Sequence, residues 1–193
     1  MTDDLLSAEF ETFFALFEQP VQFELEQKSL DNRLRHLQKR YHPDNRAKDS
    51  LVTDNALQQS EYVSALINQA YQTLSNPDSR AAYLLDIVGQ AETLEHSIAD
   101  LDFLEDAMTL RIELDEAIMS KNRSVLDSLH PQITARLHTQ SERFSHAYQQ
   151  QNWQVAIDAT QKLKFLVKLD ADITTGLDEV ANSAHLNDDD LYV

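Results

Sequence analysis

His42-Pro43-Asp44 is a tripeptide whose side chains could make a regulatory contact with another protein. Proline holds the backbone in a defined bend, and histidine and aspartate project from it as hydrogen-bond donor and acceptor. Basic residues precede it, among them Arg33, Lys39 and Arg40, and a cationic helix face could steer an acidic partner toward the bend. Taken alone, the tripeptide could equally be a helix stop followed by a turn, and the cations a solvated face. Both interpretations stay open on these residues alone.

Other groupings of reactive side chains are weaker. His138, Glu142 and His146 recur every four residues and could supply part of a metal site, but no further ligands are evident, and a solvated face is the better interpretation. The absence of cysteine excludes disulfides, thiolate metal sites and cysteine nucleophiles. The sequence also has no glycine-rich phosphate loop and no Gly-x-Ser-x-Gly elbow. We therefore expect no enzyme, no metal site and no cofactor.

Charge restricts the class of partner. The net charge of −17 argues against nucleic acid or an anionic membrane. Residues 28–48 are the exception, with seven basic residues against two acidic ones. No apolar run is long enough to span a bilayer, and the acidic start is unlike a signal or transit peptide. We expect a soluble, cytoplasmic protein.

Helices are the elements expected to position the tripeptide. Two glycines and four prolines are few for 193 residues, and the composition predicts an all-α fold. Apolar residues with helical spacing precede the tripeptide at Leu30, Leu34, Leu37 and Tyr41. Ser29 is the expected N-cap of this helix, and Pro43 requires it to end by His42. With a short aromatic helix before it and two helices after the polar loop, it forms a first module over residues 1–88.

A second module is expected after an acidic, weakly periodic linker or seam over residues 89–100. Residues 101–193 predict a three-helix bundle, with helices over about 100–119, 124–150 and 152–181. Asn152 is the expected N-cap of the third helix. Pro131 falls inside the second helix, where we expect a kink or a broken first turn and not a new domain.

The first bundle helix carries apolar residues on two sides. One stripe can form the bundle core and comprises Phe103, Ala107, Leu110, Leu114 and Ala117. Leu104, Met108 and Ile112 lie on another side, and Phe165 and Leu169 lie off the core seam of the third helix. We expect an exposed partner site formed by Leu104, Met108, Ile112 and Phe165, with Glu116 near its rim. Packing against the first module is the alternative, and it is nearly as good for Leu169.

Together, the basic helix, the tripeptide and the following helix resemble the J-domain family. The matching segments are the helix over residues 30–41, His42-Pro43-Asp44, and Ile67-Asn68-Gln69-Ala70-Tyr71-Gln72-Thr73-Leu74. The resemblance implies a helical hairpin with short flanking helices. It also implies that His42, Pro43 and Asp44, aided by Arg33, Lys39 and Arg40, stimulate ATP hydrolysis by a DnaK-type chaperone.

The rest of the chain is similar to HscB, the J-protein family of iron–sulfur cluster assembly. The similarity lies in Tyr83-Leu84-Leu85, Phe103-Leu104, residues 110–116 and Lys162-Leu163-Lys164-Phe165-Leu166. It implies an HscA-like chaperone and an IscU-like scaffold protein as partners, with the scaffold bound at Leu104, Met108, Ile112, Glu116 and Phe165. The chain departs from the family pattern at Glu105, Thr109 and Ile112.

Three hypotheses about function follow. The first is an HscB-like co-chaperone that activates a partner ATPase and delivers the scaffold. The second is a J-protein with a different client, which would keep the activity of the tripeptide and lose the scaffold contact. The third is a helical metal-dependent enzyme in which His42 is a ligand, and it requires stoichiometric metal in the purified protein.

Overall fold

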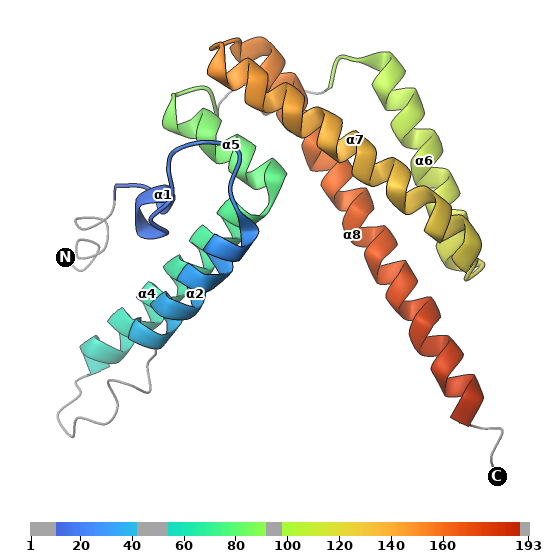
Figure 1. Ribbon diagram of the computed structural model, residues 1–193, viewed down its shortest axis with the longest axis horizontal. Helices are drawn as coiled ribbons and strands as arrows, with labels where there is room; N and C mark the ends of the chain where they lie inside the picture. Colours follow the sequence, from blue (N-terminus) through green and yellow to red (C-terminus); the bar gives the residue numbers. More distant parts are fainter. Residues whose placement is uncertain (1–10, 42–53, 92–97, 190–193) are drawn as a thin grey trace. The chain divides into compact units, whose positions relative to one another are not determined.

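The chain folds into two compact units, Met1–Val88 and Gly89–Val193. The computed structural model describes residues 11–41, 54–91 and 98–189 (Figure 1). The helices are α1 (Phe13–Leu16), α2 (Gln27–Tyr41), α4 (Asp54–Ser75), α5 (Pro77–Ile87), α6 (Leu101–Met119), α7 (Arg123–Gln149) and α8 (Trp153–Asp189). These ranges contain no β-strand, which confirms the predicted all-α class. Within them, no helix is both long and apolar enough to cross a membrane.

The first unit is built on a hairpin of α2 and α4. Tyr71, near the end of α4, donates a hydrogen bond of 2.8 Å to Asp31 in α2 and accepts one of 3.1 Å from Gln27. Because Gln27 and Asp31 lie at the start of α2, these bonds fix the two helices as antiparallel (Figure 1). The inward sides of both helices are apolar and fully buried, at Leu30, Leu37, Ile67, Ala70 and Leu74.

Aromatic packing attaches α1 to α5. The backbone N–H of Phe13 donates to Tyr83 Oη at 3.0 Å, and the rings of the two residues stack with centroids 4.7 Å apart. Phe14 and Phe17 are fully buried, so the predicted aromatic side of this segment forms part of the core. Thr12 caps α1 by accepting a hydrogen bond from the N–H of Ala15. This packing places the chain that leads into α2 against the hairpin.

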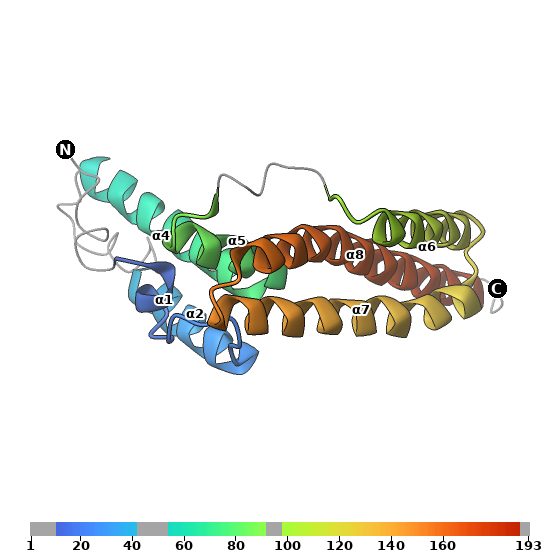
Figure 2. The same cartoon turned by 90° about the horizontal axis from the view of Figure 1, so that it is seen from above.

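The second unit is a three-helix bundle, as the sequence predicts. Figures 1 and 2 show α7 and α8 side by side along most of α7, with α6 packed against the pair. The core draws on all three helices and comprises Leu110, Leu114, Ala117, Leu126, Leu129, Ile133, Leu169 and Ile173. Leu169 is only 1% exposed and belongs to this core, so packing within the bundle accounts for its burial.

The two turns of the bundle share one construction. Lys121 and Gln151 each adopt a left-handed conformation, with φ of 51° and 57°, directly after the C-cap residue of a helix. The next residues, Asn122 and Asn152, donate their backbone N–H to Ala117 and Ala147 at 2.9 Å. Their side chains then accept a hydrogen bond from the first turn of the following helix. Each turn therefore closes one helix and caps the next within three residues.

Three details of the helices differ from the sequence-based expectations. α2 begins at Gln27, so Ser29 lies inside the first turn, and its hydroxyl accepts a hydrogen bond of 3.0 Å from Gln19 and caps nothing. α7 continues through Pro131 as one helix, so the expected broken first turn is wrong. The side chain of Gln132, the residue after the proline, donates a hydrogen bond of 3.1 Å to the carbonyl of Ser128. α8 continues to Asp189, beyond the expected end near residue 181.

Candidate partner-binding surfaces

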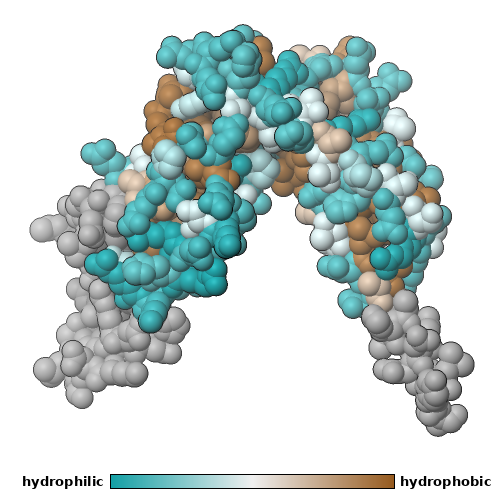
Figure 3. Space-filling model, in the orientation of Figure 1, coloured by the Kyte–Doolittle hydropathy of each residue, from teal (hydrophilic) through white to brown (hydrophobic). Residues whose placement is uncertain are grey.

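The basic side of α2 is the described part of the first candidate surface, and Figure 3 shows mainly hydrophilic residues over this helix. His42, Pro43 and Asp44 lie outside the described residues, directly after the end of α2 at Tyr41. Lys39 and Arg40 occupy the last turn of α2, where cations interact favourably with the negative end of the helix dipole. Both side chains are exposed, and the guanidinium of Arg40 lies 5.4 Å from the centre of the Tyr41 ring. The exposed positive charge of this turn thus lies next to the tripeptide in sequence.

Arg33 has a different environment from Lys39 and Arg40. Its side chain is only 15% exposed, and its Nε donates a hydrogen bond of 3.1 Å to the backbone carbonyl of Leu16 at the end of α1. Its Nη1 lies 2.9 Å from the carboxylate of Glu18. Both contacts tie α2 to the segment before it. The fold therefore already engages the Nε and Nη1 of Arg33, and less of its hydrogen-bonding capacity remains for a partner.

A polar depression of about 490 Å³ adjoins Arg33 in the first unit. It is lined by Phe17, Glu18, Gln19, Ser29, Asn32, Arg33 and His36. Hydrogen bonds internal to the protein occupy much of this lining, since Gln19 binds Ser29 and Arg33 binds Glu18. The depression consequently belongs to the junction of α1 and α2.

The second candidate surface lies on α6. Ala107, Leu110, Leu114 and Ala117 are buried, as predicted for the core stripe, whereas Phe103 is half-buried. Met108 and Ile112 point the other way and are 63% and 58% exposed. Glu116 is exposed on the same helix. The helix therefore presents large apolar side chains to solvent on the side opposite its core, where the sequence predicts a partner site.

Leu104 and Phe165 lie at the edge of this surface. Both side chains are half-buried, and Phe165 packs against the bundle core from α8. Its ring and that of Phe103 form a T-shaped pair, with centroids 6.3 Å apart and the planes at 82°. Since Phe103 and Leu104 are neighbours at the start of α6, this contact brings Phe165 close to the predicted α6 residues. Of the five predicted positions, three are exposed and two are partly covered.

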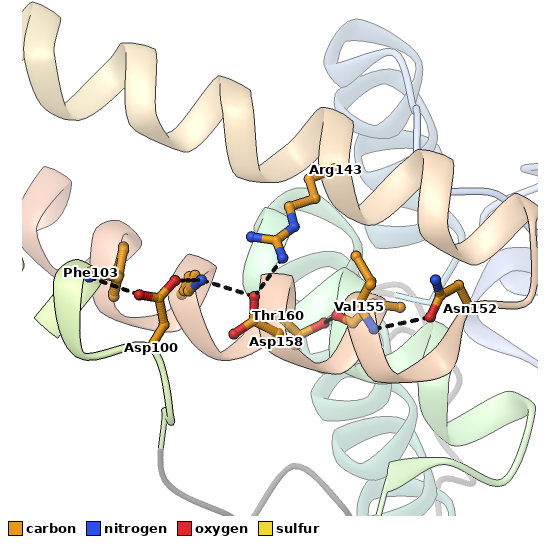
Figure 4. A network of polar contacts seen from close by, with 9 residues as sticks. Asp100, Phe103, Arg143, Asn152, Val155, Asp158 and Thr160 are labelled. Carbon is orange, nitrogen blue, oxygen red and sulfur yellow. Dashed lines mark hydrogen bonds and ion pairs between the residues drawn. The ribbon is translucent and has the colours of Figure 1, made fainter.

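An ionic cluster fixes the start of α6 on the bundle (Figure 4). Lys162 is 2% exposed, and its ammonium lies 2.5 Å from Asp100 and 2.9 Å from Asp158. Arg143 of α7 lies 3.1 Å from the same oxygen of Asp158. Asp100 also caps α6 by accepting a hydrogen bond from the N–H of Phe103 at 3.0 Å. We call Asp100, Arg143, Asp158 and Lys162 the ionic cluster.

The hydrogen bond from Lys162 is the main reason that the pKa of the Asp100 carboxyl lies below its ordinary value of 3.8. The bond from the N–H of Phe103 acts in the same direction. Asp100 is therefore ionised at neutral pH and holds two positive partners, the ammonium and the end of the helix. The cluster sets where α6 begins, and with it the position of Leu104 and Met108.

Two further contacts hold the rest of α6. Arg111 reaches Asp172 of α8 at 2.5 Å and Asp115 of its own helix at 3.0 Å. Near the end of α6, Ile118 packs against Gly176 of α8, where an added Cβ would come within 2.9 Å of the Ile118 side chain. Glycine at this position permits the close approach of the two helices. The orientation of α6 is thus fixed at its start, middle and end.

Two exposed apolar residues and the ionic cluster were not predicted from the sequence. Leu101 and Met119, at the two ends of α6, are 76% and 86% exposed. Their separation from Met108 and Ile112 by seven residues each was a usable signal, because it places them on the same side of a helix. Lys162 could not be identified as buried, since lysine is rarely buried unless paired and one of its two partners, Asp100, is 62 residues away.

The described ranges contain no group of three or more His, Asp or Glu residues arranged to hold a metal ion. His138 and Glu142 lie 3.4 Å apart on α7 and are both well exposed, with side chains 73% and 69% accessible. This pair has the geometry of a surface ion pair.

Comparison with known proteins relates both units to co-chaperones. Residues 99–174 match the family described as "HSCB C-terminal oligomerisation domain". The chain is similar to the chaperone HscB from Vibrio cholerae, with 33% sequence identity, a TM-score of 0.70, and coverage of 88% of this chain and 99% of that one. The similarity therefore extends across both units.

Two eukaryotic structures share the fold at lower identity. The human co-chaperone HscB is 24% identical with a TM-score of 0.66, covering 84% of this chain and 82% of the human chain. The Jac1 co-chaperone from Saccharomyces cerevisiae is 22% identical with a TM-score of 0.59, covering 85% of this chain and 92% of the yeast chain. At these identities the likeness concerns the fold, which combines an N-terminal J-domain with a C-terminal helical bundle.

Proposed function

This chain belongs to the HscB family of co-chaperones, and on that premise we propose that it stimulates the ATPase of an HscA-like, DnaK-type chaperone and delivers an IscU-like scaffold protein to it. The observation that carries the proposal is the exposure of Met108 and Ile112 on the bundle of a chain that also carries His42-Pro43-Asp44. A large apolar side chain on a folded surface commonly marks a site of protein association.

The two units have separate roles in this proposal. Residues 1–88 act as the J-domain, residues 89–100 connect, and residues 101–193 bind the scaffold. The chain is an activator of its partner's ATPase and performs no chemistry of its own. We expect it to meet both partners in the cytoplasm, where it would participate in the assembly or transfer of iron–sulfur clusters.

His42, Pro43 and Asp44 would bias the chaperone toward hydrolysis, with Lys39 and Arg40 steering it into place. Steering needs exposed charge, and both cations are exposed in the last turn of α2. Arg33 stays within the predicted surface, but its contacts with Leu16 and Glu18 support a role mainly in fixing α2.

The scaffold would bind where Met108 and Ile112 are exposed, next to Leu104 and Phe165. Such a contact would bury apolar surface, and each Å² buried contributes about 25 cal/mol of favourable free energy. These side chains are therefore the candidate anchors of the contact. Glu116 would lie at the rim, where charge affects the rate of association more than affinity. Binding both partners on one chain would raise the effective concentration of the scaffold near the chaperone.

The test is steady-state ATP hydrolysis by the cognate HscA-like chaperone, with and without the IscU-like scaffold. We expect wild type to stimulate hydrolysis and His42→Gln to abolish stimulation. His138→Gln is the matched control, since His138 is 73% exposed on the bundle, and it should behave as wild type.

A second arm tests the client. Met108→Ala combined with Phe165→Ala should remove only the increment that the scaffold adds, whereas Val21→Ala, at another exposed apolar residue, should leave it intact. Stimulation that survives His42→Gln contradicts the J-domain assignment. If the scaffold adds nothing to wild type, the chain is a J-protein with a different client.

A further inference from the structure

The exposed apolar side of α6 is longer than the predicted scaffold site. Among the described residues, eight large apolar side chains are exposed, and half of them lie on this helix. They are Leu101, Met108, Ile112 and Met119. We call these four residues the outer face of α6.

The spacing of these residues places them in one line. They are separated by seven, four and seven positions, so at 100° per residue they fall within about 40° of one another around the helix. At a rise of 1.5 Å per residue, the line is about 27 Å long. The predicted site, by comparison, reaches neither end of α6.

The outer face has no part in the packing of the bundle. The core of α6 is formed by Ala107, Leu110, Leu114 and Ala117, and its start, middle and end are held by the ionic cluster, Arg111 and Ile118. Leu101 and Met119 are the most exposed of the large apolar residues that the structure describes. The stability of the unit therefore does not account for their apolar character.

Carboxylates border the outer face. Glu105 and Glu116 are exposed and lie next to Met108 and Ile112 around the helix. The one basic residue of α6, Arg111, is paired with Asp115 and Asp172, so it does not offset the two glutamates. A binding partner consequently needs apolar side chains in a line, with basic side chains beside them.

This charge pattern selects among occupants. A second copy of the chain would place carboxylates of one α6 near those of the other, which is unfavourable. An apolar partner segment flanked by lysine or arginine would be attracted by the same carboxylates. The face thus fits a different protein better than it fits itself.

We propose that Leu101 and Met119 extend the scaffold-binding surface to both ends of α6, so that the IscU-like protein contacts the whole outer face through one apolar segment with basic flanks. This inference rests on the proposed function. It adds two anchors, at opposite ends, to the positions already assigned, and it defines the chemistry of the partner surface.

The experiment is calorimetric titration of the IscU-like scaffold into the full chain. Leu101→Gln and Met119→Gln replace exposed apolar residues with glutamine, which also favours helix formation. Each should raise Kd about tenfold, the loss of affinity expected when one apolar anchor is removed. Val21→Gln, at an exposed apolar residue of the other unit, should bind as wild type. A loss of affinity in that control would mean that any apolar surface suffices, which overturns the proposal.

A Met108→Ala variant separates this inference from the proposed function. If Met108→Ala binds weakly while Leu101→Gln and Met119→Gln bind as wild type, the extension is wrong and the scaffold assignment stands. If all three variants bind the scaffold as wild type does, both the extension and the scaffold assignment are wrong. Circular dichroism of each variant should match wild type, because none of the three side chains is buried.

Two further readouts test the partner chemistry. Combined Glu105→Gln and Glu116→Gln should slow association and reduce its salt dependence, and an unchanged salt dependence would refute the basic flanks. Sedimentation equilibrium should show no dimer of wild type that is lost in the Met119→Gln variant. Such a dimer would make the outer face a contact between copies of this chain and overturn the proposal.

Discussion

The basic side of α2 and the outer face of α6 differ in how much of each surface the fold itself uses. On α2, Arg33 holds the end of α1 and is 15% exposed, so a residue predicted to contact a partner also maintains the unit. On α6, Met108 and Ile112 make up part of a face that is more than half exposed and lies opposite the core. Substitution of Arg33 on α2 therefore mixes effects on stability and on binding, whereas substitutions on the outer face of α6 affect binding alone.

The largest expected difference is between the two sides of α6. Leu114→Ala should lower the free energy of unfolding of the second unit by about 3 kcal/mol, because it opens a cavity at a fully buried position. Ile112→Ala, two residues away, should change it by less than about 0.5 kcal/mol. Trp153, the only tryptophan, lies in the bundle, so its fluorescence during urea unfolding reports on this unit. Similar losses for the two variants would contradict the assignment of the faces.

The ionic cluster should give the next largest effect. Lys162→Met retains the buried methylenes but removes charged hydrogen bonds, which should lower the free energy of unfolding by about 2 kcal/mol at neutral pH. The matched variant Lys168→Met, at an exposed lysine of the same helix, should have little effect.

The effect of Lys162→Met should depend on pH in a defined direction. The pKa of Asp100 is lowered in the folded protein, chiefly by the hydrogen bond from Lys162. The ionised carboxyl therefore contributes its full stabilisation above the ordinary pKa of 3.8, and this stabilisation is lost as the pH falls through the folded pKa. Wild type and Lys162→Met should therefore converge in stability as pH falls below about 3.8. A difference that stays constant on acidification would show that packing, and not ionic pairing, makes Lys162 important.

A smaller difference should separate two arginines of α2. Arg33→Ala should destabilise the first unit by about 1.5 kcal/mol through its lost bonds to Leu16 and Glu18. Arg40→Ala should change the free energy of unfolding of this unit by less than about 0.5 kcal/mol, because the Arg40 side chain is exposed. It should nevertheless reduce stimulation of the chaperone's ATPase, since exposed charge steers the partner. Hydrogen exchange of the α2 amides measures the first effect. If Arg33→Ala leaves that exchange unchanged, Arg33 has no structural role.

The bundle was the more predictable unit, because its boundaries are encoded locally. Asn152 acts as the N-cap that the sequence suggests, and α6 and α7 begin and end within one residue of the expected positions. The predicted core stripe of α6 is buried apart from the half-buried Phe103. Short-range signals of capping and helical periodicity were sufficient for these features.

Features that depend on distant residues were not predictable. Ser29 has the side chain of an N-cap, but it bonds to Gln19 in the segment before α2. Leu169 lies off the seam expected for α8, yet the packing of α6 and α7 covers it completely. The roles of Arg33 and Lys162 likewise depend on partners from other elements. Helical periodicity identifies which residues share a side, and tertiary contacts decide which sides are used.

The central claim is that one chain must carry both surfaces, because it brings the scaffold to the chaperone. His42→Gln keeps the bundle surface, and Met108→Ala with Phe165→Ala keeps the J-domain. The decisive measurement is ATP hydrolysis by the chaperone with the scaffold and an equimolar mixture of these two variants. We predict that the mixture gives no scaffold-dependent increment, since neither variant links the two partners. A mixture that restores the wild-type increment would show that the two surfaces act separately and would contradict delivery.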